Sequence, residues 1–312
     1  MKAGPVVRLA PAKLNLTLAV VGTRSDGYHG LHSVMVRLTL ADRVSVAPST
    51  GPVDTLHVEG LDAGPEATNL VMRAVAEARS RVPRGSAPPL SILLDKRIPV
   101  AAGLAGGSSD AAAALDAALE AWGTEVTPEA HGDAAAALGS DVPFFLAGGA
   151  ALVEGRGERV TPLRGIRGEP PGIVLVTPAV RVPTPAVFEA WDAGARIAGS
   201  AARMSSEHLA GELGAGMTAE QLLTRAGVLA SANDLLPAAA ALVPELVALR
   251  RALMRLLGRP VGQSGSGPTL WALYPSLAAA EDAARTVREG DLPGVGEDRP
   301  FVQATTIERS DV

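Results

Sequence analysis

The chain has 312 residues, which is long for a single hydrophobic core and sufficient for two domains. Its composition, 47% hydrophobic and 20% charged, is typical of globular proteins rather than of disordered ones. A formal net charge of -5, with no run of basic residues, gives no electrostatic footprint for nucleic acid or for an anionic membrane. We therefore expect neither nucleic acid nor a membrane among the partners.

Other residue patterns exclude further classes of function. The chain has no cysteine, so disulfides, thiolate nucleophiles and cysteine-ligated metals are excluded. Its five histidines form no H-E-x-x-H pair, which leaves a zinc hydrolase with little support, and we assign no metal ligand. The N-terminus lacks the apolar core of a signal peptide and no apolar run is long enough to span a bilayer, so we expect a cytoplasmic protein.

Lysine is scarce, because only three of the 28 basic residues are lysines, and one of them lies in an expected strand. Residues 12–21 alternate as a strand does, with Leu14 and Leu16 on one face and Lys13 and Asn15 on the other. The ammonium of Lys13 could hold a carboxylate or phosphate oxygen. A lysine on the solvated face of a strand is an equally common alternative, and position alone leaves both open.

The elements that follow in the first half predict an α+β fold. A turn-rich segment, GTRSDGYHG, comes after this strand. The patterns then predict strands over 34–47 and 53–59, a helix over 68–81 and a strand at PLSILLD. Strands therefore come first and helices later, which favours α+β.

A glycine-rich loop then runs directly into a helix at PVAAGLAGGSSDA. Ser108 or Ser109 is expected to be the N-cap of this helix, with Asp110 in its first turn. Such a turn is a natural anion site, because backbone N–H groups and the positive end of the helix dipole converge there. It is not a Walker A loop, because the chain has no Gly-Lys pair, and it does not match G-x-G-x-x-G, because Ala105 replaces the second glycine. A tight turn that merely packs the helix remains the alternative.

A second helix is expected to begin at Thr127-Pro128 and to end at Gly139, which leads the chain to Asp141. Asp141 could be a general base that accepts the proton of a substrate hydroxyl as this oxygen attacks phosphorus. It could equally be the N-cap of the short apolar segment VPFFL. The local sequence leaves both interpretations open.

Glycine and proline become dense over residues 160–174, and we predict the domain boundary there, with domains at 1–165 and 166–312. The second half predicts a strand at 173–177, several helices up to about 257, a glycine turn at GQSGSGPT, and then strand, helix and strand. Alone this turn is more often a plain loop. It could, however, meet the first glycine-rich loop across an interdomain cleft, where small-molecule sites tend to lie.

Two aromatic residues fall in segments that we expect to be loops, namely Tyr28 in SDGYHG and Phe188 in PTPAVF. Their rings could stack on a base or a sugar, and His29 could donate a hydrogen bond to such a base. Core packing is the default for any single phenylalanine, and a solvated turn is the plain alternative for the histidine.

Six sequence blocks together resemble the GHMP small-molecule kinases in order and spacing: PAKLNLTL, DGYHGLHSV, PVAAGLAGGSSDAAAAL, LGSDVPFF, PTP with a following Phe, and SGSGPTL. The resemblance covers nearly the whole chain. It implies a two-domain α+β GHMP kinase fold, with an N-terminal domain like ribosomal protein S5 domain 2 and a ferredoxin-like C-terminal domain. ATP and substrate would meet between these domains. The expected assembly is a monomer or a weak homodimer.

The resemblance also implies an activity, which is ATP-dependent phosphorylation of the 2-hydroxyl of a cytidine diphosphate-linked polyol in isoprenoid precursor synthesis. It places Asp141 as the base, Lys13 beside it, and Asn15 in contact with substrate. Tyr28, His29 and Phe188 fall where such kinases grip the cytidine. The ATP contacts implied are Asn69, Pro99, Val100, Ala101, Ala102, Gly103, Leu104, Ala105, Gly106, Gly107, Ser108 and Ser109.

Mg²⁺ is implied by ATP chemistry, because the ion neutralises charge on the phosphate oxygens. Only Ser108 and Ser109 are plausible protein contacts, so no dedicated ligand is assigned. One departure concerns the loop, where Ala101 and Ala105 occupy positions at which the family usually has glycine. If these positions need positive φ, alanine costs about 1 kcal/mol at each.

Two other interpretations of the chain are weighed against this one. The first is another GHMP kinase, of the homoserine or mevalonate type, which is disfavoured because DGYH and PTP-Phe match the cytidine-binding pattern. The second is a catalytically silent relative, which would be expected to lose Lys13 or Asp141, and both are present.

Overall fold

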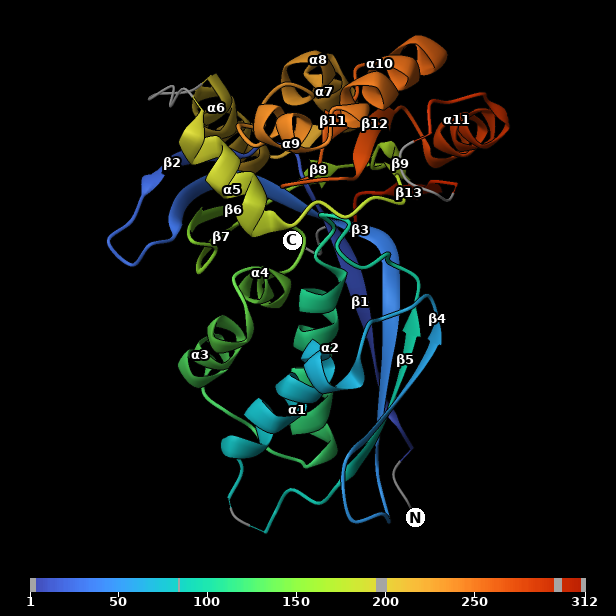
Figure 1. Cartoon of the computed structure of the whole chain (residues 1–312). Coiled ribbons are helices and arrows are strands. Elements are labelled where there is room, and N and C mark those ends of the chain that lie inside the picture. The colour runs from blue at the N-terminus through green and yellow to red at the C-terminus, as the bar shows by residue number, and fades with distance from the viewer. Residues whose placement is uncertain (1–3, 84, 195–200, 295–298, 310–312) are drawn as a thin grey trace. The chain divides into compact units, whose positions relative to one another are not determined.

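The computed structural model describes residues 4–83, 85–194, 201–294 and 299–309. The chain divides into two compact units (Figure 1). Unit 1 comprises Met1–Ala12, Leu40–Val100 and Ala105–Leu146, and unit 2 comprises Lys13–Thr39, Ala101–Leu104 and Ala147–Val312. The expected division at residues 165/166 concerns domains along the sequence, which compactness does not test, and it stays a prediction.

The sheet of unit 1 is formed around strand β5 (Leu90–Lys96). This strand pairs in parallel with β4 (Thr55–Gly60) and antiparallel with the second half of β3 (His29–Pro48). In the second pair Val44 lies opposite Leu94, and both side chains are fully buried. The apolar residues of β5 thus face the helices rather than solvent, as its alternating pattern predicts.

Alanine-rich helices complete unit 1 (Figure 1). Helix α1 (Leu70–Ser80) packs on α2 (Gly106–Ala121) and on α3 (Pro128–Leu138). Eleven residues of α2 are buried, and six of them are Ala, which allows close approach between helices. The side chain of Thr127 caps α3, as predicted. The unit also contains the first part of β1 (Val6–Asn15), the 3-10 helix Glu66–Thr68 and most of α4 (Val142–Ala147).

One sheet of unit 2 contains the first half of β3, which pairs antiparallel with β6 (Ala150–Gly155) and with β2 (Ala19–Thr23). Strand β6 continues through a tight hairpin into β7 (Arg159–Leu163), and these two strands are also antiparallel. The hairpins β2–β3 and β6–β7 therefore extend from neighbouring strands of one sheet.

A second sheet of unit 2 has the order β11-β12-β9-β13, and all of its neighbours are antiparallel. The strands are β9 (Gly172–Thr177), β11 (Gly262–Gln263), β12 (Leu270–Tyr274) and β13 (Phe301–Thr306). Every residue of β9 and β12 is buried, and helix α11 (Leu277–Glu289) packs on β9 and β13. This sheet forms the main apolar core of unit 2.

The remaining elements of unit 2 are mainly helices, and the chain order agrees with the predicted run of helices up to about residue 257. They are α5 (Thr184–Ala193), α6 (Ala201–Ala215), α7 (Ala219–Thr224), α8 (Ala226–Leu229), α9 (Leu236–Leu242), α10 (Glu245–Leu257) and the short parallel pair β8 (Ile166–Arg167) and β10 (Met217–Thr218). Within the described ranges, none of the helices is both long and apolar enough to cross a bilayer.

The single strand predicted over residues 12–21 is two strands, because β1 ends at Asn15 and β2 begins at Ala19. Between them the backbone bonds to different partners: Leu16 N–H donates to Val34 O, and Leu18 N–H donates to Ala232 O. Both faces of the segment are buried, so the predicted polar face is not a solvated one.

Candidate active site

Lys13 lies near the end of β1 and is only 4% exposed, so the solvated-lysine interpretation is wrong. Its ammonium donates to Asn15 Oδ1 at 2.6 Å and to the Gly103 carbonyl oxygen at 3.0 Å. Burying a charge in this way is costly unless hydrogen bonds compensate it, and these two do so. Lys13 is therefore a buried cation whose position is fixed by the fold.

Asn15 is oriented by a short chain of hydrogen bonds. Its Nδ2 donates to Ser33 Oγ at 2.8 Å, and Ser33 Oγ donates to the Thr17 carbonyl oxygen at 2.5 Å. This arrangement turns the Asn15 amide oxygen toward Lys13. Asn15 is 2% exposed, so in this structure its side chain serves mainly to hold the ammonium.

The segment 101–104 is attached to unit 2 by four hydrogen bonds. Lys13 N–H donates to Leu104 O at 3.0 Å, and Thr269 N–H donates to Ala102 O at 3.2 Å. The Gly103 carbonyl oxygen accepts from Lys13 Nζ and, at 2.9 Å, from Ser264 Oγ. These bonds explain why four residues of the first glycine-rich loop belong to unit 2.

The two glycine-rich turns meet, as the sequence suggested, and they do so within unit 2. A Cβ on Gly103, whose φ is +78°, would lie 2.5 Å from Ser264 O and 2.9 Å from Gly267 O. A Cβ on Gly265 would lie 3.2 Å from Asn15 Oδ1 and 3.4 Å from Lys13 Nζ. Glycine is thus required for backbone contact at Gly103.

The loop backbone has positive φ at alternate residues: Ala101 (57°), Gly103 (78°) and Ala105 (52°). Ala105 is the N-cap residue of α2 and is left-handed, so the helix begins at Gly106. The predicted caps Ser108 and Ser109 were therefore wrong, because both already lie inside the first turn. The expected strain at Ala101 and Ala105 is confirmed.

We predict that Ala105→Gly stabilises the protein by about 0.5–1 kcal/mol, because removing left-handed strain outweighs the greater freedom of glycine in the unfolded chain. Urea unfolding measures this change. Ala113→Gly, in the interior of the same helix, is the matched control and is expected to destabilise by about 0.5–1 kcal/mol. Equal losses in both variants would contradict the account.

Three ionisable side chains are buried beneath the first turn of α2 in unit 1. Lys96 donates to Asp42 Oδ2 and, at 2.7 Å, to Asp110 Oδ2, and each of the three residues is at most 2% exposed. A Cβ on Gly106 would lie 2.9 Å from Lys96 Nζ. The cluster thus supports the backbone at which the helix begins.

The two carboxyl groups differ in their hydrogen bonds. Asp42 also accepts the backbone N–H groups of Arg97 and Ile98, whereas Asp110 Oδ1 is buried without a hydrogen-bond partner among the described residues. Burial raises the pKa of Asp110 to about 8; Lys96 opposes this shift, and Asp42 adds to it. At neutral pH this raised pKa favours the protonated form of Asp110.

We predict that Asp42→Asn destabilises the protein by about 1–3 kcal/mol, because an amide weakens the hydrogen bonds that Asp42 accepts from Lys96 and from the Arg97 and Ile98 N–H groups. Asp110→Asn is expected to be much milder. Since the pKa of Asp110 is raised on folding from 3.8 to about 8, wild-type stability falls relative to Asp110→Asn as pH rises between these values, and the difference is constant above. Urea unfolding from pH 4 to 9 checks this, and a pH-independent difference would contradict it.

His29 is held by three residues of helix α5. Its ring stacks on Phe188, with centroids 4.7 Å apart, and meets Trp191 edge-on at 5.6 Å. Its Nε2 lies 3.0 Å from Asp192 Oδ2. Phe188 therefore lies on a helix and not in a loop as predicted, but the structure does bring it together with His29.

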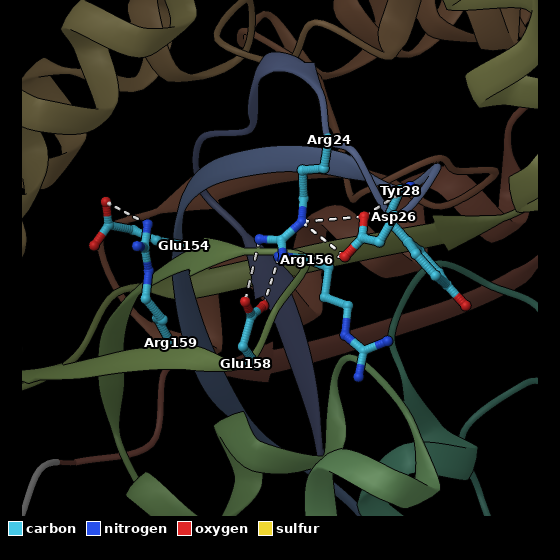
Figure 2. Close-up of polar contacts among 7 residues, drawn as sticks. All are labelled: Arg24, Asp26, Tyr28, Glu154, Arg156, Glu158 and Arg159. Atoms are coloured by element: carbon cyan, nitrogen blue, oxygen red, sulfur yellow. Dashed lines mark hydrogen bonds and ion pairs between the residues drawn. The ribbon is translucent and has the colours of Figure 1, made fainter.

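Tyr28 is half exposed and lies at the tip of the β2–β3 hairpin. Its ring contacts the Arg156 guanidinium, 5.3 Å from the ring centroid (Figure 2). Among the described residues, it makes no ring contact with His29 or Phe188. The three residues predicted to grip a nucleoside thus fall into a His29–Phe188 pair and a Tyr28–Arg156 pair.

The other predicted site residues lie in unit 1. Asn69 caps helix α1 by accepting the Val71 N–H at 2.9 Å. A Cβ on Gly107 would lie 3.7 Å from Leu70 Cδ1, so the starts of α1 and α2 are adjacent. Asp141 immediately precedes α4. The same unit contains Pro99, Val100, Ala105, Gly106, Ser108 and Ser109.

Sequence reasoning missed Ser33 and Ser264, which hold Asn15 and Gly103 in unit 2, and the Lys96 cluster, which supports the start of α2 in unit 1. For Ser264 a signal existed, since its glycine-rich turn was noted as a weak candidate. For Lys96 the only signal was the scarcity of lysine. Among the described residues, no group of three or more His, Asp or Glu is arranged to hold a metal ion.

Comparisons with known proteins agree with these blocks. The model for the GHMP kinases N-terminal domain matches residues 69–149, and that for the GHMP kinases C-terminal domain matches residues 206–290. The 4-diphosphocytidyl-2-C-methyl-D-erythritol kinase of Pelotomaculum thermopropionicum is 38% identical over 92% of this chain and 95% of its own length.

Solved structures give the same result. A crystal structure of 4-(cytidine 5'-diphospho)-2C-methyl-D-erythritol kinase has a TM-score of 0.70 and 35% identity, and the match covers 96% of this chain and 99% of that one. A homoserine kinase from Cytophaga hutchinsonii has a TM-score of 0.67 at 19% identity, covering 98% and 96% of the two chains. The second likeness shows the fold alone. The predicted two-domain GHMP kinase fold is confirmed.

Proposed function

Because the chain belongs to the 4-diphosphocytidyl-2-C-methyl-D-erythritol kinase family of the GHMP kinases, we propose that it phosphorylates the 2-hydroxyl of that cytidyl substrate with ATP, in the non-mevalonate route to isoprenoid precursors. The observation that carries the proposal is the buried Lys13 ammonium, held by Asn15 and Gly103 beside the turn that contains Gly265. These residues come from three of the six sequence blocks that the family shares.

In the proposed reaction, Asp141 accepts the proton of the substrate hydroxyl, whose oxygen then attacks the γ-phosphorus of ATP. Lys13 stabilises the negative charge that develops on this oxygen. A fixed ammonium suits this role, because its hydrogen bonds are already in place before the reaction and need no reorganisation. Asp141 is assigned this role on the family motif, which reads LGSDVP here.

The loop from Pro99 to Ser109 is proposed to bind the ATP phosphates, with Asn69 near the adenine. Two features of the backbone fit this role. Alternating positive φ is a conformation in which successive N–H groups converge on an anion. The first N–H groups of α2 also lack helical partners. Ser109 Oγ, buried and without a hydrogen-bond partner among the described residues, fits the same purpose.

Tyr28, His29 and Phe188 are proposed to bind the cytidine moiety. The clustering of aromatic side chains on α5 around His29 supports this assignment, because flat rings suit a pyrimidine base. Mg²⁺ is proposed to accompany ATP, where it would neutralise charge on the β- and γ-phosphates. Ser108 and Ser109 are the protein contacts proposed for it.

The proposal is tested by ADP release with Mg-ATP and each of three alcohols: 4-diphosphocytidyl-2-C-methyl-D-erythritol, homoserine and mevalonate. We predict turnover with the cytidyl substrate alone, and a loss of about 100-fold or more in kcat for Asp141→Asn. Turnover with homoserine or mevalonate, or none with any alcohol, would overturn the proposed substrate.

Lys13→Arg is predicted to lower kcat by about 100-fold while the protein still folds. The planar guanidinium cannot reproduce the point contact of an ammonium with Asn15 Oδ1 and Gly103 O in a site this buried. The measurement is kcat with saturating substrates, with the thermal unfolding midpoint as the control for folding. Near wild-type turnover in a folded variant would contradict the role of Lys13.

A further inference from the structure

Ion pairs between charged side chains connect the tips of two hairpins of unit 2 (Figure 2). In the β2–β3 hairpin, Asp26 Oδ1 accepts the Tyr28 N–H at 3.1 Å, and Asp26 also pairs with Arg24. In the β6–β7 hairpin, Glu158 accepts the Arg156 N–H at 2.6 Å. Arg24 pairs with Glu158 at 3.3 Å and so connects the two tips.

Near their tips, the two hairpins carry equal numbers of arginine and carboxylate side chains, but not every one of these side chains is in an ion pair. Three arginines face three carboxylates. Arg24 pairs with Asp26 and Glu158, and Arg159 pairs with Glu154 at 3.6 Å. Only the Arg156 guanidinium forms no ion pair or hydrogen bond with any described residue, and Figure 2 shows it directed away from the carboxylates.

Arg156 is nevertheless held in place, because its guanidinium lies over the ring of Tyr28 at 5.3 Å. A cation–π contact uses the flat face of the guanidinium and leaves its N–H donors, which lie in the plane, available. The hydrogen bonds from Arg24 and from the Tyr28 N–H lower the pKa of Asp26, and the nearby positive charge of Arg156 adds to this shift without a hydrogen bond. Arg156 is thus an oriented cation with unused donors.

We propose that Arg156 is a substrate-binding residue that donates to phosphate oxygens of the nucleotide-linked substrate while Tyr28 contacts its nucleoside. This inference rests on the proposed function, since Tyr28 is the residue through which the cytidine would be recognised. A planar fork of N–H donors matches phosphate geometry and can bind two oxygens at once. A phosphate therefore suits this guanidinium better than an uncharged sugar or base.

The competing explanation is purely structural. Arg24 faces two carboxylates, so Arg156 could simply offset the second negative charge and cover the Tyr28 ring. In that case, removing Arg156 would destabilise the hairpins or the position of the Tyr28 ring. It would not change the ratio between the affinities for a ligand with and without phosphate. The two explanations therefore differ in whether the contribution of Arg156 depends on the phosphate.

The experiment measures the affinities of cytidine and of cytidine 5'-diphosphate by calorimetry for the wild type, Arg156→Met and Arg159→Met. We expect the wild type to bind the diphosphate more tightly than the nucleoside. In Arg156→Met this preference falls by about 10- to 100-fold, the value of charge-assisted hydrogen bonds, while cytidine affinity is unchanged. Arg159→Met, which removes an already paired arginine from the same hairpin, should leave both affinities unaltered.

The outcomes separate the two claims. A wild type that prefers the diphosphate and an Arg156→Met variant that keeps the whole preference would overturn the inference and leave the proposed function intact. Equal losses for cytidine and for the diphosphate would also overturn it, in favour of the structural explanation. A wild type that binds neither compound would contradict the proposed function and with it the inference. Arg156→Lys, which keeps the charge without the fork, should retain part of the preference.

Discussion

The site depends on the close approach of two backbone turns, at Gly103 and at Ser264–Gly267. The approach leaves no room for a Cβ on Gly103, because it would lie 2.5 Å from a carbonyl oxygen. In return the Gly103 carbonyl receives hydrogen bonds from both Lys13 and Ser264. This contact fixes the ammonium and the first glycine-rich loop at once, so the position of the cation is a property of the backbone.

Each unit contains a buried lysine ammonium, and the hydrogen-bond partners of Lys13 and Lys96 differ. In unit 2 the Lys13 ammonium donates hydrogen bonds to the amide oxygen of Asn15 and to the carbonyl oxygen of Gly103. In unit 1 the Lys96 ammonium contacts the carboxyl groups of Asp42 and Asp110, and burial, together with the neighbouring Asp42, raises the pKa of Asp110. The Lys96 cluster supports the start of α2, and the hydrogen bonds of Asn15 and Gly103 fix the position of Lys13.

Sequence patterns predicted most helices and strands correctly, but they predicted only some of the contacts between side chains. The alternation around Lys13 correctly placed Asn15 on the same side, because strand periodicity is local. The cap of α2 was mispredicted because Ala105 is left-handed; alanine itself does not favour this conformation, and only the resemblance, in which glycine is usual there, pointed to it. Phe188 was expected in a loop because two prolines precede it, although a proline in the first turn is compatible with the helix found there. Ser33, Ser264 and Lys96 join their clusters from distant segments, which local patterns do not relate.

The most direct test of this account is the unfolding free energy of Gly103→Ala, measured in urea beside Gly107→Ala from the first turn of α2. The account predicts a loss of about 3 kcal/mol for Gly103→Ala, from left-handed strain and overlap with the Ser264 and Gly267 carbonyls. Gly107→Ala should cost nothing, because its Cβ would meet only Leu70 at an ordinary distance of 3.7 Å. A Gly103→Ala protein as stable as the control would contradict the claim that this backbone contact holds the site.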